Sequence, residues 1–487
     1  MTSPITEAQP ALEFIAPDYN PLVTGAVRSL LPLWLRWKVQ IPEIQVTGGK
    51  RLVELYRQFD AGKIRFMMAF RHPSTNDPFC MGQLLWKALP QVARKQGITL
   101  PKTPHAHFIY DRGIPLWAGD RVGWLYSKLG CTPIRRGRVD LAGLRSIRKL
   151  FTDGQFPMAA APEGGTNGHN EIVSPIEPGI AQFGFWCMED LLKADRTEQV
   201  LIVPLGIQYR FLGQPWRSIE QLLEQLEEDS GLTEQVKQEG DRLPALEDDA
   251  VPMPEQEAAL YRRLYRLGEY LLKLMEGFYT KFYHQDLKAL AETLPEPTVT
   301  PHADSKFPAN QELAKRLQTL LNAALTVAEQ YFKLSSKGTV TDRCRRIEQA
   351  GWDWIYREDI KQLEALSPVE KGLADRIAEE ASLRVWHMRL VESFVSVTGQ
   401  YVIEKPTVDR FAETLLLVWE MIVRIQGKPS FPRPQLGKQR VMITVGEPLN
   451  MGDRWSDYQS NRRQALGSLT QDLQTTLESM VVRNWEA

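Results

Sequence analysis

The residue pair best suited to chemistry is a histidine followed five positions later by an aspartate, His72 and Asp77. They flank a short turn after an apolar run at 64–70, which predicts a buried strand. An aspartate that hydrogen-bonds to an imidazole holds it in one tautomer, so that the histidine can take a proton from an alcohol. A simpler interpretation is that Asp77 caps a helix and His72 is an ordinary loop residue. With seven histidines in the chain, this spacing also arises readily by chance.

A second candidate segment, residues 130–136, ends in two arginines, Arg135 and Arg136. The planar guanidinium group carries several fixed N–H donors and suits the recognition of a phosphate. Taken alone, the same residues are typical of a solvated basic loop. The segment therefore indicates a phosphate site only if other evidence places it near His72.

The third segment is the glycine-rich stretch at 161–168. Its adjacent glycines, Gly164 and Gly165, let backbone N–H groups approach a ligand closely. The carboxylate of Glu163 could hydrogen-bond to an acceptor hydroxyl. The alternative is an ordinary turn at the exit of a strand.

The fourth segment, residues 202–209, is a core strand in which Pro204 predicts an edge or a bulge. In this order, the four segments resemble the four signature blocks of the glycerol-3-phosphate and lysophosphatidate acyltransferase family, which begin with an H-x4-D motif. The resemblance covers about residues 40–215 and 436–485. The positions that match are His72, Ser74, Asp77, Arg136, Pro162, Glu163, Gly164 and Pro204.

The resemblance implies a role for each site residue. His72 would deprotonate an acceptor hydroxyl, Asp77 would orient His72, and the hydroxyl would attack an acyl thioester. The donor would be acyl carrier protein or coenzyme A, with no metal, cofactor or covalent acyl-enzyme. The activity would belong to phospholipid synthesis. The implied substrate-binding residues are Ser74, Arg135, Arg136, Glu163, Gly164, Gly165 and Thr166.

Three positions depart from the family pattern: Arg71 replaces an asparagine, Ala161 an aromatic residue and Thr166 an arginine that helps hold the acceptor phosphate. Arg71 or Arg135 could supply the missing charge. The departure at Thr166 leaves a non-phosphorylated acceptor such as diacylglycerol open beside glycerol phosphate and lysophosphatidate. A third alternative is a non-enzymatic relative that binds a membrane or a partner protein.

The surrounding pattern predicts the elements that position these residues. Strand-like runs at 41–46, 64–70, 107–110, 156–162 and 200–209 alternate with helical stretches at 52–59, 77–96, 119–130, 139–151 and 180–193. Such alternation predicts an α/β fold with a mostly parallel sheet flanked by helices. The family resemblance implies the glycerolipid acyltransferase variant of this fold.

The middle of the chain has a different, helical periodicity, with predicted helices at 255–290, 311–334, 368–398 and 408–426. A strand at 439–449 and a helix at 460–482 follow. We therefore expect a tail and amphipathic helix at 1–40, an α/β domain at 41–215, a helical insertion at 216–435 and the closing strand and helix of that domain at 436–487. The insertion could be a lid, a carrier-protein dock, an oligomer contact or a decoration without a ligand role.

Composition limits the classes of function. The 59 basic and 60 acidic residues give no electrostatic case for binding nucleic acid. Four widely spaced cysteines favour reduced thiols in the cytoplasm over a disulfide framework or a zinc site. The N-terminus lacks the pattern of a secretory signal, and we expect a cytoplasmic protein that is peripheral on a membrane.

The most apolar stretch, residues 22–39, contains Trp34 and Trp37 beside basic residues. Pro32 and the charged residues argue against a helix that crosses a membrane. Two interpretations remain, an amphipathic helix packed on the core and a helix that lies in a membrane interface.

Overall fold

The computed structural model describes residues 5–115, 119–135, 139–232, 254–294, 308–394 and 399–483. The chain divides into two compact units. Residues 13–213 and 437–487 form the first, here called the α/β unit, and residues 1–12 and 214–436 form the second, the helical unit. The N-terminal segment that the sequence predicts at 1–40 is thus shared between the two units.

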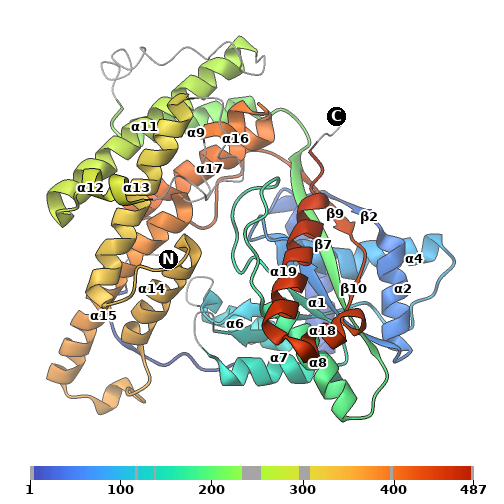
Figure 1. Cartoon of the computed structure of the whole chain (residues 1–487). Helices are drawn as coiled ribbons and strands as arrows, with labels where there is room; N and C mark the ends of the chain where they lie inside the picture. The colour runs from blue at the N-terminus through green and yellow to red at the C-terminus, as the bar shows by residue number, and fades with distance from the viewer. Residues whose placement is uncertain are drawn as a thin grey trace. The chain divides into compact units, whose positions relative to one another are not determined.

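The α/β unit is built on one eight-stranded sheet (Figure 1). Seven strands follow the order β2-β9-β7-β3-β6-β4-β5, and the eighth, β10, pairs with β7. Neighbours in this order are parallel, except that β7 and β9 are antiparallel, as are β7 and β10. This confirms the predicted α/β class with a mostly parallel sheet. The strands are β2 Glu43–Thr47, β3 Ile64–Phe70, β4 His107–Asp111, β5 Thr132–Ile134, β6 Met158–Ala160, β7 Gln199–Phe211, β9 Gln439–Val445 and β10 Leu449–Asn450.

Strand β3 shows why the sheet is covered on both faces. All seven of its residues are buried, which fits a central strand of a parallel sheet. Because side chains alternate, Phe66, Met68 and Phe70 enter one apolar cluster with the helices between residues 21 and 95. Met67 and Ala69 enter a second cluster on the opposite face, with the helices at 141–153, 179–193 and 462–479.

The helices of the α/β unit mostly fall where the periodicity predicts them, although several are shorter. The predicted helix at 77–96 consists of α3, a π-helical turn at Leu84–Ala88 and α4. The bounds are α1 Pro21–Trp37, α2 Gly49–Asp60, α3 Asp77–Gln83, α4 Leu89–Lys95, α6 Asp120–Lys128, α7 Leu141–Asp153, α8 Gly179–Lys193, α18 Trp455–Ser460 and α19 Arg462–Ser479.

Strand β7 is long and changes partner along its length. Its first part pairs with β3 up to Leu205, and its second part pairs with β9 from Leu205 onward. The expectation that Pro204 marks an edge strand is wrong, because β7 lies inside the sheet. Pro204 is tolerated because it lies where the β9 ladder stops: its carbonyl accepts the last bond, from the amide of Gly446 at 2.9 Å.

The helical unit contains long helices that begin and end close to the predicted positions. The predicted helix at 255–290 is broken at His284, which has φ +54°, into α11 and α12. The bounds are α9 Trp216–Asp229, α11 Glu255–Tyr283, α12 Leu287–Thr293, α13 Pro308–Phe332, α14 Val340–Ile355, α15 Pro368–Phe394, α16 Gly399–Ile403 and α17 Val408–Ile425. Among the described helices, none is long and apolar enough to cross a membrane.

Residues 5–20 make specific contacts, whereas the sequence predicts only a tail there. Strand β1, Gln9–Pro10, pairs in parallel with β8, Tyr356–Arg357. Further along, the amides of Asp18 and Asn20 donate to carbonyls at the end of α6. Sequence composition misses such contacts because their partners lie far along the chain.

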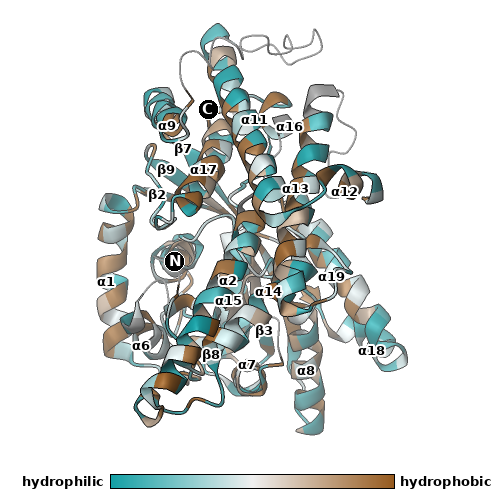
Figure 2. Cartoon of the chain, turned by 90° about the vertical axis from the view of Figure 1, so that its left-hand side faces the viewer, coloured by the Kyte–Doolittle hydropathy of each residue, from teal (hydrophilic) through white to brown (hydrophobic). Residues whose placement is uncertain are grey.

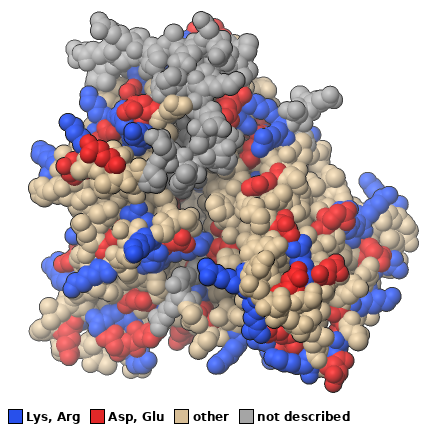
Figure 3. Space-filling view, viewed as in Figure 1, with Lys and Arg blue, Asp and Glu red and all other residues tan. Residues whose placement is uncertain are grey.

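On the face drawn in Figure 3, the basic and acidic side chains of the described residues are interspersed.

Candidate active site

The turn between β3 and α3 carries His72 and Asp77. The amide of Arg71 donates to the carbonyl of Leu205 at 2.9 Å, which extends the β3–β7 ladder by one bond. The chain then turns, and the Asp77 amide donates to the carbonyl of Ser74 at 3.1 Å. Asp77 is the first residue of α3 and is followed by Pro78, which suits a first helical turn. The turn thus lies at the carboxyl end of a central parallel strand.

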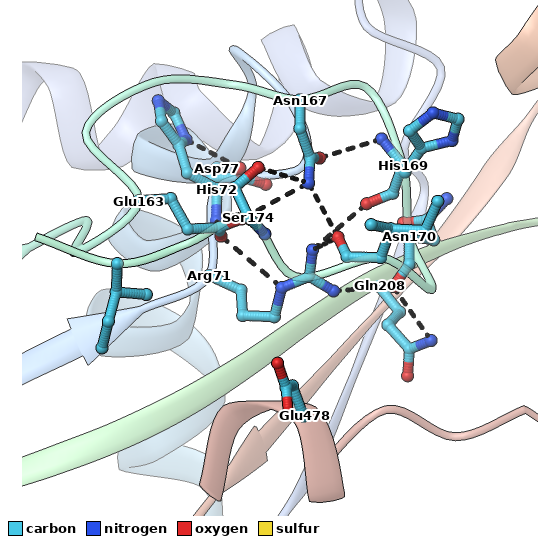
Figure 4. A network of polar contacts seen from close by, with 12 residues as sticks. Arg71, His72, Asp77, Glu163, Asn167, His169, Asn170, Ser174, Gln208 and Glu478 are labelled. Carbon is cyan, nitrogen blue, oxygen red and sulfur yellow. Dashed lines mark hydrogen bonds and ion pairs between the residues drawn. The ribbon is translucent and has the colours of Figure 1, made fainter. Parts of the chain in front are cut away.

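His72 and Asp77 are in direct contact, with His72 Nδ1 2.9 Å from Asp77 Oδ2 (Figure 4). The same oxygen accepts the amide of Ser74 at 2.9 Å. The other oxygen, Oδ1, accepts the hydroxyl of Tyr209. The Asp77 side chain is fully buried, whereas the His72 side chain is 20% exposed. Because an ionised Asp77 accepts from Nδ1, the neutral imidazole has its lone pair on Nε2.

Burial and hydrogen bonding act on Asp77 in opposite directions. Burial raises the pKa of the Asp77 carboxyl, while the hydrogen bonds from His72, Tyr209 and the Ser74 amide favour the ionised form. Burial raises the pKa of Tyr209 well above its ordinary value, so the phenol keeps its proton and donates it to Asp77. The arrangement can orient a histidine base and stabilise its protonated form.

Glu163, just after β6, holds the backbone of His72. Its Oε1 accepts the His72 amide at 2.7 Å, and its Oε2 accepts the Ser174 amide at 2.9 Å. Asn167 Nδ2 lies 3.4 Å from the same Oε2. Gly164 has φ +71°, a conformation that favours glycine, and its amide donates to Ala161 at 3.2 Å. Both oxygens of the Glu163 carboxylate therefore accept hydrogen bonds from groups within the protein.

Arg71 holds the loop that follows Glu163. Its guanidinium donates to the carbonyls of Asn170 at 2.7 Å, Ile172 at 2.6 Å and His169 at 3.2 Å. Its Nε lies 3.5 Å from Glu163 Oε1, and both side chains are almost fully buried. The expectation that Arg71 could supply the phosphate-binding charge is therefore contradicted. Its charge is directed into a buried network rather than toward a ligand (Figure 4).

The loop also attaches to the part of β7 that extends beyond β3. The side-chain oxygen of Asn170 accepts the Tyr209 amide at 2.7 Å. Arg210 donates to Glu171 at 2.6 Å. Asn170 therefore replaces a strand partner for β7, and the same contact fixes the backbone of Tyr209, whose hydroxyl reaches Asp77.

The predicted substrate-binding residues are not all brought together. Ser74 and Glu163 contact the His72–Asp77 turn directly, while Gly165 and Thr166 are exposed on the loop after Glu163. Arg136 lies outside the described residues. Arg135 follows β5, and its amide donates to Asp140 Oδ2 at 2.8 Å.

Arg135 and His72 nevertheless share one edge of the sheet. The strands β3, β6, β4 and β5 are parallel neighbours, so their carboxyl ends lie on the same side. Since neighbouring strands are about 4.8 Å apart, β3 and β5 are separated by roughly 14 Å.

Reasoning from the sequence missed Tyr209, Asn167 and Asn170. Tyr209 closes the predicted strand at 202–209, but nothing in its spacing points to a partner 132 positions away. Asn167 donates to the carbonyl of Ile172 at 2.7 Å and to Ser174 Oγ at 3.1 Å, within one loop. The sequence feature that could have pointed to this loop is the cluster of polar residues directly after the glycines.

Comparisons of the chain with models of protein families, with curated proteins and with solved structures found no match.

Proposed function

We propose that this protein transfers a fatty acyl chain from a thioester to a hydroxyl of a lipid precursor, on an acyltransferase-like α/β unit. The observation that carries the proposal is the contact between His72 and the buried carboxylate of Asp77 at the carboxyl end of β3. The ordered resemblance to the glycerolipid acyltransferases supports the same conclusion.

In the proposed reaction, His72 Nε2 takes the proton of the acceptor hydroxyl as the oxygen attacks the thioester carbonyl carbon. The new C–O bond forms an ester, and the C–S bond breaks. The departing thiolate receives the proton from the imidazolium, which restores the neutral base. Asp77 stabilises the imidazolium while it exists, and Glu163 keeps the His72 backbone in place.

The acceptor we favour is glycerol phosphate or a lysophospholipid such as lysophosphatidate, and the donor is acyl carrier protein or coenzyme A. Arg135, on the same sheet edge as His72, supports a phosphorylated acceptor. We place the activity in phospholipid synthesis at a membrane surface facing the cytoplasm. The exposed Thr166 favours the second candidate, transfer to a non-phosphorylated alcohol such as diacylglycerol, because the family arginine is replaced there.

The test incubates the full-length protein with palmitoyl-coenzyme A or palmitoyl-acyl carrier protein and, in turn, glycerol 3-phosphate, lysophosphatidate and diacylglycerol. We expect transfer to one of the two phosphorylated acceptors. Transfer to diacylglycerol alone would establish the second candidate. Absence of transfer to every acceptor, by a folded protein, would favour a non-enzymatic role in binding a membrane or partner.

Two variants test the mechanism. His72→Ala should lower kcat by roughly 10²- to 10⁴-fold, the usual contribution of a general base. Asp77→Asn retains a similar shape but loses the carboxylate that orients the charged imidazole, so it should lose a similar factor. Undiminished transfer by both variants would exclude this mechanism.

A further inference from the structure

Helix α1 presents large apolar side chains to solvent along one face. Leu22 is 83% exposed, Trp37 is 76% exposed and Leu30 is 63% exposed. Leu33 and Trp34 are 57% and 39% exposed. Five large exposed hydrophobic residues in one helix form a patch of the kind that marks an interaction site.

The patch is separate from the face by which α1 packs on its own unit. Thr24, Leu31 and Leu35 are buried, and they recur at the spacing of one helical face. At 100° per residue, Leu22 and Leu33 lie on the opposite side of the helix. The helix is therefore apolar on two faces, of which the protein covers one. Figure 2 shows hydrophobic residues, in brown, along the ribbon of α1.

Charge identifies the partner that suits this face. Helix α1 contains no acidic residue, and its charged residues are Arg28 and Arg36, with Lys38 at its C-terminal cap. Arg28 lies toward the buried face and donates to Thr103 Oγ1 at 3.0 Å, whereas Arg36 and Lys38 are exposed at the same end of the helix as Trp37. Basic side chains beside exposed leucines and tryptophans are the composition of helices that lie in the interface of anionic membranes.

We propose that the outer face of α1 inserts into the interface of a bilayer that contains anionic phospholipids. The leucines and Trp37 enter the boundary between headgroups and acyl chains, and Arg36 and Lys38 contact lipid phosphates. The helix lies in the membrane plane, since its 17 residues include Pro32 and end in charged residues.

This placement brings lipid close to the candidate site. The ring of Trp34 packs 4.5 Å from that of Phe79, which lies on α3 two residues after Asp77. Helix α1 thus connects the proposed membrane surface to the helix that begins at the site. The inference goes beyond acyl transfer, because membrane binding is measured without any substrate.

The experiment is sedimentation of the full-length protein with vesicles of phosphatidylcholine, with or without phosphatidylglycerol. We expect the wild type to sediment with the anionic vesicles and to be released as salt is raised, since salt screens the basic residues. Leu33→Ser combined with Trp37→Ser should lower the partition coefficient by roughly tenfold or more, because apolar area no longer leaves water. Arg36→Glu combined with Lys38→Glu should abolish the preference for anionic vesicles.

The matched control is Phe282→Ser combined with Leu373→Ser, which removes an aromatic residue and a leucine that are 61% and 65% exposed on α11 and α15. The control should sediment like the wild type. Equal sedimentation of the α1 double variant and the wild type would overturn the proposal. So would a wild type that ignores vesicles but forms a dimer that the α1 variant loses, because the face would then bind a second copy.

A second measurement does not depend on the stability of the double variants. The four native cysteines are buried, so Trp37→Cys places one accessible thiol on the outer face for an environment-sensitive dye. Anionic vesicles should shift the emission of the dye to shorter wavelength. The same dye at Phe282→Cys should not respond, and a lack of response at position 37 would count against insertion.

Discussion

The α/β unit and the helical unit each bury an arginine against a glutamate, but they use the pair differently. In the α/β unit, Arg71 lies beside Glu163, and both side chains form most of their other hydrogen bonds with main-chain groups. In the helical unit, Arg343 on α14 donates to both oxygens of Glu329 on α13, at 2.7 and 2.8 Å, and to the Asn322 side chain. The same residue types thus hold a loop in one unit and connect two helices in the other.

The cause of this difference is the backbone. Residues inside a helix satisfy most of their own main-chain groups, so a buried charged side chain there bonds mainly to other side chains. A buried loop has main-chain groups without regular partners, and side chains must supply them. A dense set of side-chain to backbone bonds, as around His169 and Asn170, therefore marks a loop that is held in one conformation.

Each unit also contains a histidine that is held by a hydrogen bond, but the two histidines differ in exposure. His72 contacts a carboxylate and keeps part of its ring exposed, an arrangement that suits a base. His387 is fully buried, with Nδ1 2.7 Å from the Tyr279 hydroxyl and the ring against Tyr283 and Trp386. Burial lowers the pKa of His387 to about 3, so it stays neutral and serves packing.

The largest effect should come from the two arginines. Removing one partner of a buried ion pair costs about 3–5 kcal/mol of unfolding free energy, so Arg71→Met and Arg343→Met should be destabilised to a similar degree. Only Arg71→Met should also lose acyl transfer per folded molecule and show faster hydrogen exchange at 163–174. Urea unfolding, steady-state kinetics and hydrogen exchange measure the three quantities. Equal loss of transfer in both variants would contradict the assignment of loop positioning to Arg71 alone.

The buried histidine of the helical unit predicts a pH dependence of stability. An unfolded histidine binds a proton near pH 6.5, whereas His387 in the folded state does so at about 3. Between about pH 3 and pH 6.5 the unfolded chain binds more protons than the folded protein. The contribution of neutral His387 to stability is therefore fully present above about pH 6.5 and is lost as the pH is lowered. The loss should be on the order of 3 kcal/mol by pH 4.5, since each pH unit below 6.5 contributes about 1.4 kcal/mol.

In His387→Gln this part of the pH dependence should disappear, while transfer at neutral pH is retained. Urea unfolding followed by circular dichroism between about pH 4.5 and pH 7 measures the slope. An unchanged slope would show that other groups cause it.

The smallest expected effects come from removing the hydroxyl groups of Tyr209 in the α/β unit and Tyr279 in the helical unit. Tyr209→Phe removes the donor to Asp77 Oδ1 and should lower kcat by roughly tenfold, about 1.4 kcal/mol. Since that bond favours the ionised carboxylate, its loss raises the pKa of Asp77 further and should move the acidic limb of the activity profile to higher pH. Tyr279→Phe should instead cost about 1 kcal/mol of stability without changing kcat. A pH profile that is identical in Tyr209→Phe and the wild type would remove Tyr209 from the site.

The local sequence pattern was sufficient to predict the strand and the helix that flank the His72–Asp77 pair. The apolar run at 64–70 forms β3 with the expected bounds, and the helix begins at Asp77 as expected. Both follow from short-range chemistry, namely continuous burial of a central strand and a proline in the first turn.

The contacts that surround the pair could not be predicted in the same way. Arg71 reaches Ile172, and Tyr209 reaches Asp77, across 101 and 132 positions of sequence. Such contacts depend on where the loop after β6 passes over β7, which no local periodicity encodes. The same limit explains why the sequence suggested that Arg71 could supply a phosphate-binding charge and that Glu163 could contact the acceptor.

The position of β9 has a consequence for how the chain is made. This strand lies between β2 and β7, yet the ribosome adds it only after the whole helical unit. Until then, β2 lacks the strand that joins it to the sheet, and the second part of β7 exposes an unpaired edge. Such edges invite pairing with other chains. The sheet of the nascent α/β unit therefore stays incomplete during the synthesis of residues 214–436. We expect the chain to be most prone to aggregation in this period, before β9 emerges.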